Sequence, residues 1–192
     1  MTGPQWERSI KVTTAEQTRR LAAALAGVLE AGDLLVLTGE LGAGKTTFTQ
    51  GLGEGLGVRA GIISPTFVLV RIHPNLPEGP RPGGPDLVHV DAYRLDSAAE
   101  IDDIDLENTM DTSVTVVEWG RDRVEHLSDS RLEVDLHRAV GGGAAPAAAA
   151  GTTLDFETED DDEPRTIVLR GFGPRWPEAP GFLGNAPLEG GN

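Results

Sequence analysis

Cysteine is absent from the 192-residue chain. Disulfide bonds, thiolate catalysis and zinc–sulfur sites are therefore excluded together, and the composition suits a reducing compartment. Long apolar runs are lacking too, and the N-terminus carries Gln5, Glu7 and Arg8 where a signal peptide would be apolar. We therefore expect a cytoplasmic protein that does not associate with a membrane.

Positive charge is scarce. The 16 Lys and Arg residues stand against 31 Asp and Glu residues, for a formal net charge of −15. Because such a chain repels phosphate backbones at long range, we expect no broad basic face for nucleic acid, and any RNA to be bound mainly by a partner. Part of the charge is local, in the acidic run from Glu157 to Glu163, which we interpret as a solvated loop.

Lysine is the rarer cation, with only Lys11 and Lys45. Lys45 lies in a complete G-x-x-x-x-G-K-[ST] phosphate-binding loop, which follows an apolar run at residues 34–37 and precedes a helical pattern. The glycines let backbone N–H groups surround phosphates at a helix N-terminus; Lys45 would reach the β- and γ-phosphates, and the Thr46 hydroxyl would bind Mg²⁺. We interpret the segment as a nucleoside triphosphate site. Its loop residues are Gly39, Glu40, Leu41, Gly42, Ala43, Gly44, Lys45 and Thr46.

A magnesium ion at such a loop also needs a carboxylate at the end of a neighbouring apolar strand. Two predicted strands end in this way, one at Asp91 and one at Glu118. Spacing alone does not decide between them, and a shared role stays open, in which one binds the metal and the other orients the attacking water. The segment 64–66 (Ser-Pro-Thr) lies where a first switch loop would sense the γ-phosphate, with a plain turn as the alternative.

The kind of nucleotide and reaction is less sharply indicated. Neither lysine follows an asparagine, so the Asn-Lys-x-Asp loop that reads guanine is missing and ATP is favoured. A small-molecule P-loop kinase and a nucleotide-gated interaction module are the alternatives to an ATPase. The absence of an arginine-rich lid counts against the kinase. Because no arginine occupies an evident finger position, we expect slow hydrolysis until a partner completes the site.

Alternating strand and helix patterns predict an α/β, P-loop NTPase-like three-layer fold with a mostly parallel central sheet. We expect a single ATPase domain over residues 1–170. Its peculiarities are a Pro/Gly-rich insert at 74–86, interpreted as an exposed hairpin extension, an Ala/Gly linker at 141–151 and the acidic loop at 157–163. After Gly171 the sequence shows no periodicity, so we expect residues 171–192 to be a disordered tail.

Four motifs follow one another along the chain: Gly39-Glu-Leu-Gly-Ala-Gly-Lys-Thr-Thr-Phe48, Ser64-Pro-Thr-Phe67, His89-Val-Asp-Ala-Tyr-Arg-Leu95 and Val117-Glu-Trp-Gly120. Together they resemble the bacterial TsaE (YjeE) family, the ATPase component of tRNA threonylcarbamoyladenosine biosynthesis. The phosphate loop is common to many ATPases, whereas the last two motifs are much more specific. The resemblance spans about residues 10–137, and the insert, linker, acidic run and tail depart from the family pattern without touching a motif.

This resemblance implies a small Mg²⁺-dependent ATPase that is slow alone, acts with the TsaB–TsaD complex, and meets tRNA indirectly through that complex. It implies Thr46 and Glu118 as the Mg²⁺ ligands and Asp91 as a switch-like acid needed for hydrolysis. Trp119 resembles the family's aromatic residue beside the site, and Thr47 its second threonine after the loop. The expected catalytic residues are thus Lys45, Asp91 and Glu118, with ATP and Mg²⁺ as cofactors.

Overall fold

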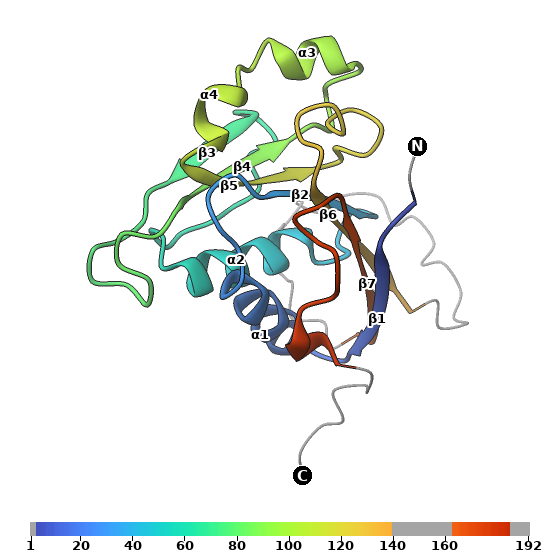
Figure 1. Ribbon diagram of the computed structural model, residues 1–192. Coiled ribbons are helices and arrows are strands. Elements are labelled where there is room, and N and C mark those ends of the chain that lie inside the picture. Colours follow the sequence, from blue (N-terminus) through green and yellow to red (C-terminus); the bar gives the residue numbers. More distant parts are fainter. Residues whose placement is uncertain (1–2, 140–162, 185–192) are drawn as a thin grey trace, which may run out of the picture.

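The computed structural model describes residues 3–139 and 163–184. In these residues, seven strands form one sheet in the order β1-β7-β6-β2-β5-β4-β3, flanked by helices (Figure 1). The strands are β1 (Trp6–Val12), β2 (Leu34–Gly39), β3 (Val70–His73), β4 (Asp86–Asp91), β5 (Ser113–Glu118), β6 (Arg131–Arg138) and β7 (Arg165–Phe172). The helices are α1 (Ala15–Ala26), α2 (Lys45–Leu56), α3 (Ala98–Asp102), α4 (Glu107–Met110) and the 3₁₀ turn η1 (Gly181–Leu183).

The four central strands β6, β2, β5 and β4 are parallel, and the outer strands on both sides pair antiparallel. β2 is the centre of this arrangement, with Leu37 opposite Glu118 of β5 and Val134 of β6. Its apolar run is fully buried, as expected for a parallel strand covered on both faces. The expected α/β fold class with a mostly parallel core is therefore confirmed, and the phosphate loop starts from the middle of the sheet.

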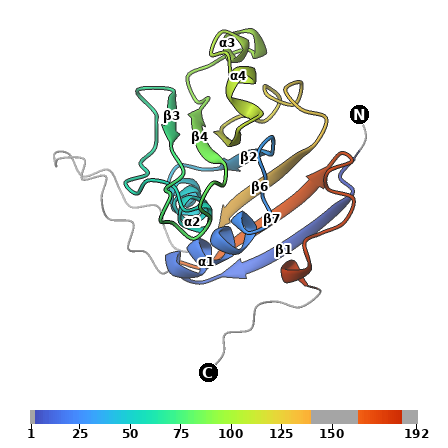
Figure 2. The same cartoon turned by 60° about the vertical axis from the view of Figure 1, so that its left-hand side comes forward.

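Helices cover the sheet unequally on its two sides. α1 and α2 lie side by side on one face, and α3 and α4 lie beyond the other, over the β4–β5 half (Figure 1 and Figure 2). The first core joins Leu25 and Phe48 to the alternating Leu132, Val134 and Leu136 of β6. The second core places the α3–α4 segment over β2, β4 and β5, through Ile101, Leu106, Met110, Val36, Val90 and Val117. No helix among the described residues has both the length and the apolar character to span a bilayer.

Close contact between α1 and α2 depends on glycine. A Cβ on Gly55 would lie 2.6 Å from the carbonyl oxygen of Ala23, closer than real Cβ atoms come, so the two helices can only touch where the side chain is missing. α1 begins at a cap in which Thr14 Oγ1 accepts from Gln17 N at 3.1 Å. The side-chain oxygen of Gln17 accepts a hydrogen bond from the backbone N–H of Thr13, which satisfies one more donor at the helix start.

The acidic stretch after β4 is not one continuous helix. It consists of two short helices, α3 and α4, separated by Asp105, whose φ is 60°. A non-glycine residue in the left-handed region cannot continue a right-handed helix, so the chain turns there. Ser97 and Glu100 form a complete capping box at the start of α3.

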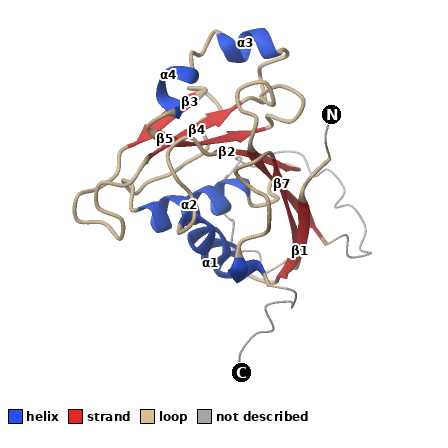
Figure 3. Cartoon of the chain, in the orientation of Figure 1, coloured by secondary structure: helices blue, strands red, loops and turns tan. Residues whose placement is uncertain are grey.

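The Pro/Gly-rich insert connects β3 to β4 in an antiparallel hairpin (Figure 3). It is anchored by side chains: Arg81 Nη1 donates to the carbonyl oxygens of Ala26 and Leu29, and Asn75 Nδ2 donates to that of Leu56 at 2.9 Å. The last carbonyls of a helix have no partner within it. The insert therefore caps the C-terminal ends of both α1 and α2.

The expectation of a disordered tail that begins at residue 171 is wrong for residues 171–184, which are ordered and packed against the domain. β7 continues to Phe172, and the buried side chains of Trp176 and Leu183 belong to the first core. Arg175 reaches back to Asp33 and to the carbonyl oxygen of Val28. Residues 185–192, the linker at 141–151 and residues 157–162 of the acidic loop lie outside the described residues.

Candidate functional site

The phosphate loop joins the end of β2 to the start of α2. Gly42 and Gly44 have φ values of 77° and 100°, in the left-handed region that favours glycine. Gly44 is the N-cap of α2, and Lys45 is its first residue. The first N–H groups of a helix have no intrahelical partner, so this turn is built to receive an anion.

Lys45 is buried within this loop. Its Nζ donates to the carbonyl oxygens of Gly39 at 2.8 Å and Glu40 at 3.0 Å, and lies 4.4 Å from the ring centroid of Trp119. Trp119 follows β5 with a φ of 61°, and its backbone N–H donates to Leu37 of β2. The structure thus brings the predicted aromatic residue directly over the predicted lysine. Thr46 and Thr47 lie in the same first turn of α2.

Glu118 ends β5 in register with Leu37, two residues before the loop begins. Its side chain is 4% exposed, and its Oε1 lies 2.8 Å from Nε2 of the buried His89. Because a carboxylate can only accept, Nε2 carries the proton in this bond. The histidine holds the carboxylate in place at the strand end, where P-loop proteins position a carboxylate for their metal.

Asp91 ends β4 directly beside Glu118, with which it is in register. Its Oδ2 accepts from Thr66 Oγ1 at 2.9 Å and from Ser64 Oγ at 3.3 Å, and its Oδ1 accepts from the backbone N–H of Tyr93 at 2.9 Å. The predicted switch segment 64–66 is therefore tied to one of the two candidate carboxylates. A change at Asp91 would be transmitted to this loop.

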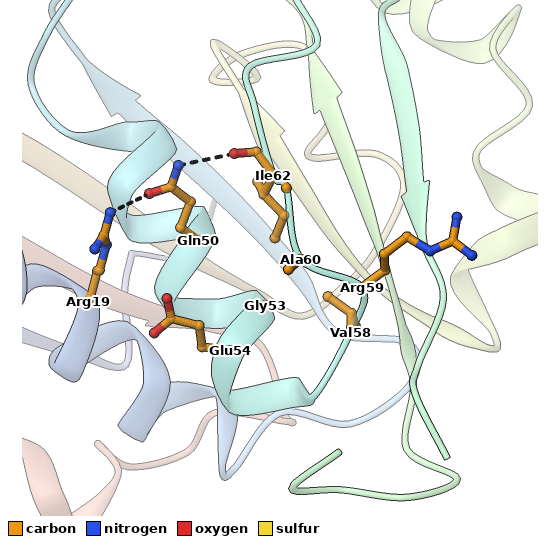
Figure 4. Close-up of a pocket in the computed structure, with 9 residues that line it drawn as sticks. Arg19, Gln50, Gly53, Glu54, Val58, Arg59, Ala60 and Ile62 are labelled. Atoms are coloured by element: carbon orange, nitrogen blue, oxygen red, sulfur yellow. Dashed lines mark hydrogen bonds between the residues drawn. The ribbon is translucent and has the colours of Figure 1, made fainter. Parts of the chain in front are cut away.

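Two hollows lie near these elements. The first, of about 250 Å³, is lined by Thr38, Tyr93, Trp119, Arg121 and Arg123, so it opens beside the aromatic residue that covers Lys45. The second, of about 230 Å³, lies between α1, α2 and residues 58–62 (Figure 4). There Arg19 donates to Gln50 Oε1, and Gln50 Nε2 donates to the carbonyl oxygen of Ile62, both at 3.0 Å. This chain of bonds fixes the segment that leads into the switch.

The residues fit a magnesium ion only together with a nucleotide. In the described parts of the chain, no three His, Asp or Glu side chains are grouped as a metal site. Mg²⁺ at phosphate sites takes one or two protein oxygens and completes its shell with phosphate and water. The hydroxyl of Thr46 and the carboxylate of Glu118 are oxygen donors of the required kind.

One residue beside the loop was not identified from the sequence. Arg165, the first residue of β7, is 7% exposed, and its Nη1 lies 2.6 Å from the position that a Cβ on Gly44 would take. The only available signal was its place in the alternation with the buried Ile167 and Leu169. That signal predicts an inward-facing arginine but not what it faces.

The fold and the loop define a P-loop NTPase-like protein. The family model described as threonylcarbamoyl adenosine biosynthesis protein TsaE matches residues 12–142. A Streptomyces coelicolor protein named tRNA threonylcarbamoyladenosine biosynthesis protein TsaE is 48% identical over 162 residues, which cover 84% of this chain and 95% of that protein. The Bacillus subtilis protein of the same name is 36% identical over 130 residues, covering 67% and 77%.

A solved structure shares the fold. The crystal structure of Bacillus subtilis YdiB superposes with a TM-score of 0.61 and 28% identity, covering 89% of both chains. The chain belongs to the TsaE family.

Proposed function

We propose that this chain binds and hydrolyses ATP with Mg²⁺ as a component of the tRNA threonylcarbamoyladenosine modification machinery, acting with the TsaB–TsaD complex. The observation that carries the proposal is that β2 leads into the loop that holds Lys45, while Glu118 and Asp91 end the next two parallel strands, β5 and β4, in register with each other. Membership of the TsaE family, whose relatives are named for this modification, supports the pathway.

In the proposed reaction the chain positions phosphates and forms no covalent intermediate. The Lys45 ammonium and the first N–H groups of α2 bind the phosphates and stabilise the charge that develops during transfer. The Thr46 hydroxyl and the Glu118 carboxylate would hold Mg²⁺, which neutralises phosphate charge when bound. Asp91 orients the attacking water, and its bond to Thr66 couples the switch segment to the reaction.

Exposed apolar side chains beside the switch support a role for a protein partner. Phe67 is 85% exposed and Leu41 84% exposed, and Ile63 and Val68 are more than half exposed. Apolar side chains gathered beside a functional loop are typical of an interaction site. A partner that covers them would order the switch segment and complete the site, so we expect hydrolysis by the chain alone to be slow.

ATP hydrolysis by the full chain, with and without Mg²⁺ and with and without the purified TsaB–TsaD complex, tests the proposal. We expect a low Mg²⁺-dependent rate that rises when the complex is added. A rate that does not change when TsaB–TsaD is added, together with no binding between TsaB–TsaD and this chain, would contradict the partner role and leave a stand-alone ATPase. Failure to bind ATP with Mg²⁺ would overturn the proposal entirely.

A nucleotide-gated interaction module is the second candidate, because the bond between Thr66 and Asp91 connects the nucleotide site to an exposed apolar segment. In such a module, binding of ATP changes the affinity for the partner, and hydrolysis is not required. The two candidates differ in what they demand of Asp91.

A further inference from the structure

Arg165 is a buried cation pressed against the phosphate loop from the side of β7. The residue is 7% exposed, and its guanidinium occupies the space that Gly44 leaves by having no side chain. Gly44 directly precedes Lys45, at the N-terminus of the 12-residue helix α2. The guanidinium therefore adds positive charge to the turn of backbone that is expected to surround phosphate.

The other arginines of β6 and β7 pair with carboxylates. Arg170, on the same strand, pairs with Glu7 and with Asp135, each at 2.6 Å, and Arg138 pairs with Glu163. By contrast, Arg165 forms no ion pair within residues 3–139 and 163–184, and its buried Nε has no hydrogen-bond partner there. A buried cation without a counter-ion is costly. The structure keeps it at the place where an anionic ligand is expected.

The sheet order indicates which part of the ligand Arg165 would meet. Glu118 and Asp91 lie on β5 and β4, on one side of β2, whereas β6 and β7 lie on the other side. The two carboxylates serve the metal and the γ-phosphate in the proposed reaction. Arg165 lies on the other side of β2 from them, so it would face the α- and β-phosphates of a bound nucleotide rather than the γ-phosphate.

We propose that Arg165 is a nucleotide-binding residue that contacts the α- or β-phosphate of bound ATP. The inference rests on the proposed ATP site and adds to it a contact supplied by β7. Because ADP carries the same two phosphates, Arg165 strengthens the binding of ADP and ATP alike. It sets nucleotide affinity rather than the rate of hydrolysis.

Calorimetric titration with Mg·ADP and with a non-hydrolysable Mg·ATP analogue tests this assignment in Arg165→Met. Removing a charge-assisted contact should lower the affinity for both nucleotides by about 10- to 100-fold. The fall in affinity with rising salt should also be shallower than in the unmodified chain, because one phosphate-binding cation is missing. Arg170→Met is the matched control, since Arg170 lies on the same strand but pairs with carboxylates on the other face. It should keep both affinities.

Thermal unfolding without nucleotide separates ligand binding from a structural role. Arg165→Met removes a buried charge that has no ion pair among the described residues, so its Tm should equal or exceed that of the unmodified chain, whereas Arg170→Met breaks two ion pairs and should lower it. If Arg165→Met does not fold, Arg165→Gln, which keeps a polar tip, is titrated in its place.

Four results are decisive. Unchanged ADP affinity in the Arg165 variant overturns the inference, and so does a loss confined to the ATP analogue, which would place the contact at the γ-phosphate. Loss of both affinities in the Arg165 variant but not in Arg170→Met supports it. If the unmodified chain binds neither nucleotide, it is the proposed function that fails, and the two failures are thereby distinguished.

Discussion

Among single residues, Lys45 carries the most direct test of the site. Its ammonium contacts loop carbonyls and the Trp119 ring, so Lys45→Ala removes a cation without opening the apolar core. We predict that hydrolysis of Mg·ATP falls by about 100-fold or more, because a charge aimed at the transferring phosphate is lost. Initial rates measure the effect, and circular dichroism checks the fold. Lys11→Ala, at the exposed second lysine, is the control, and equal rates in both variants would refute the site assignment.

A substitution at Asp91 distinguishes the proposed ATPase from a nucleotide-gated interaction module. Its carboxylate accepts from Thr66 and lies beside Glu118. We predict that Asp91→Ala lowers kcat by about 100-fold, as expected when a residue that orients the nucleophile is lost, while the affinity for a non-hydrolysable ATP analogue is kept. tRNA modification in the reconstituted system should fail with it. A nucleotide-gated module would instead retain modification in this variant, provided that ATP still binds.

At the scale of elements, the segment after β7 is held to the α1–β2 connection by one arginine. Arg175 Nε and Nη2 each lie 3.2 Å from a carboxylate oxygen of Asp33, and Nη2 donates to the carbonyl oxygen of Val28 at 2.8 Å. Burial raises the pKa of Asp33, an effect opposed by the backbone N–H of Glu30, which donates to Oδ2, and by the Arg175 guanidinium. The buried carboxylate of Asp33 is therefore stabilised in part by the Arg175 guanidinium.

We predict that Arg175→Ala lowers the free energy of unfolding by about 1–3 kcal/mol, because it leaves Asp33 buried without its charged partner. Urea unfolding of the full chain measures the loss. Arg20→Ala is the control: Arg20 pairs with Glu16 on the exposed face of α1, and such surface pairs contribute about 0–1 kcal/mol. Similar losses in the two variants would show that the C-terminal segment is not held by this pair.

The elements that were predictable from sequence are those that repeat a local pattern. β2, β4, β5 and β6 are short apolar or alternating runs, and the phosphate loop carries its own motif. The segment 173–184 has no such repeat, because its order depends on single long-range anchors, Trp176 in the core and Arg175 on Asp33. Likewise, the break between α3 and α4 is set by one residue, Asp105, in a conformation that composition does not reveal.

At the scale of the whole molecule, the site is assembled by sheet register. Spacing could not decide between Asp91 and Glu118 because the two residues end adjacent parallel strands at the same level. Arg165 could not be placed at all, since its position depends on β7 returning antiparallel between β6 and β1, opposite Arg138 and Val12. Local sequence therefore predicted the lysine and the pair of carboxylates as candidates, while contacts across the sheet were available only from the fold.

The acidic chain, with its net charge of −15, is poorly suited to hold tRNA alone, so its proposed function depends on a protein surface. Phe67 is the most exposed large apolar side chain of the described residues, and Arg94 lies 5.0 Å from its ring centroid. Aromatic and arginine side chains dominate the energy of many interfaces. The two residues together therefore mark the surface where we expect the TsaB–TsaD complex to bind.

We predict that Phe67→Ser leaves the basal ATPase rate of the chain unchanged and raises the concentration of TsaB–TsaD needed for half-maximal stimulation. Loss of a central aromatic contact costs about 2 kcal/mol or more, which corresponds to about 30-fold in affinity. Phe182→Ser, at a partly exposed phenylalanine in the C-terminal 3₁₀ turn, is the matched control and should respond to the complex like the unmodified chain. Equal stimulation of the two variants would place the partner surface away from the switch, and a slow basal rate, if measured, would then have its cause within the chain itself.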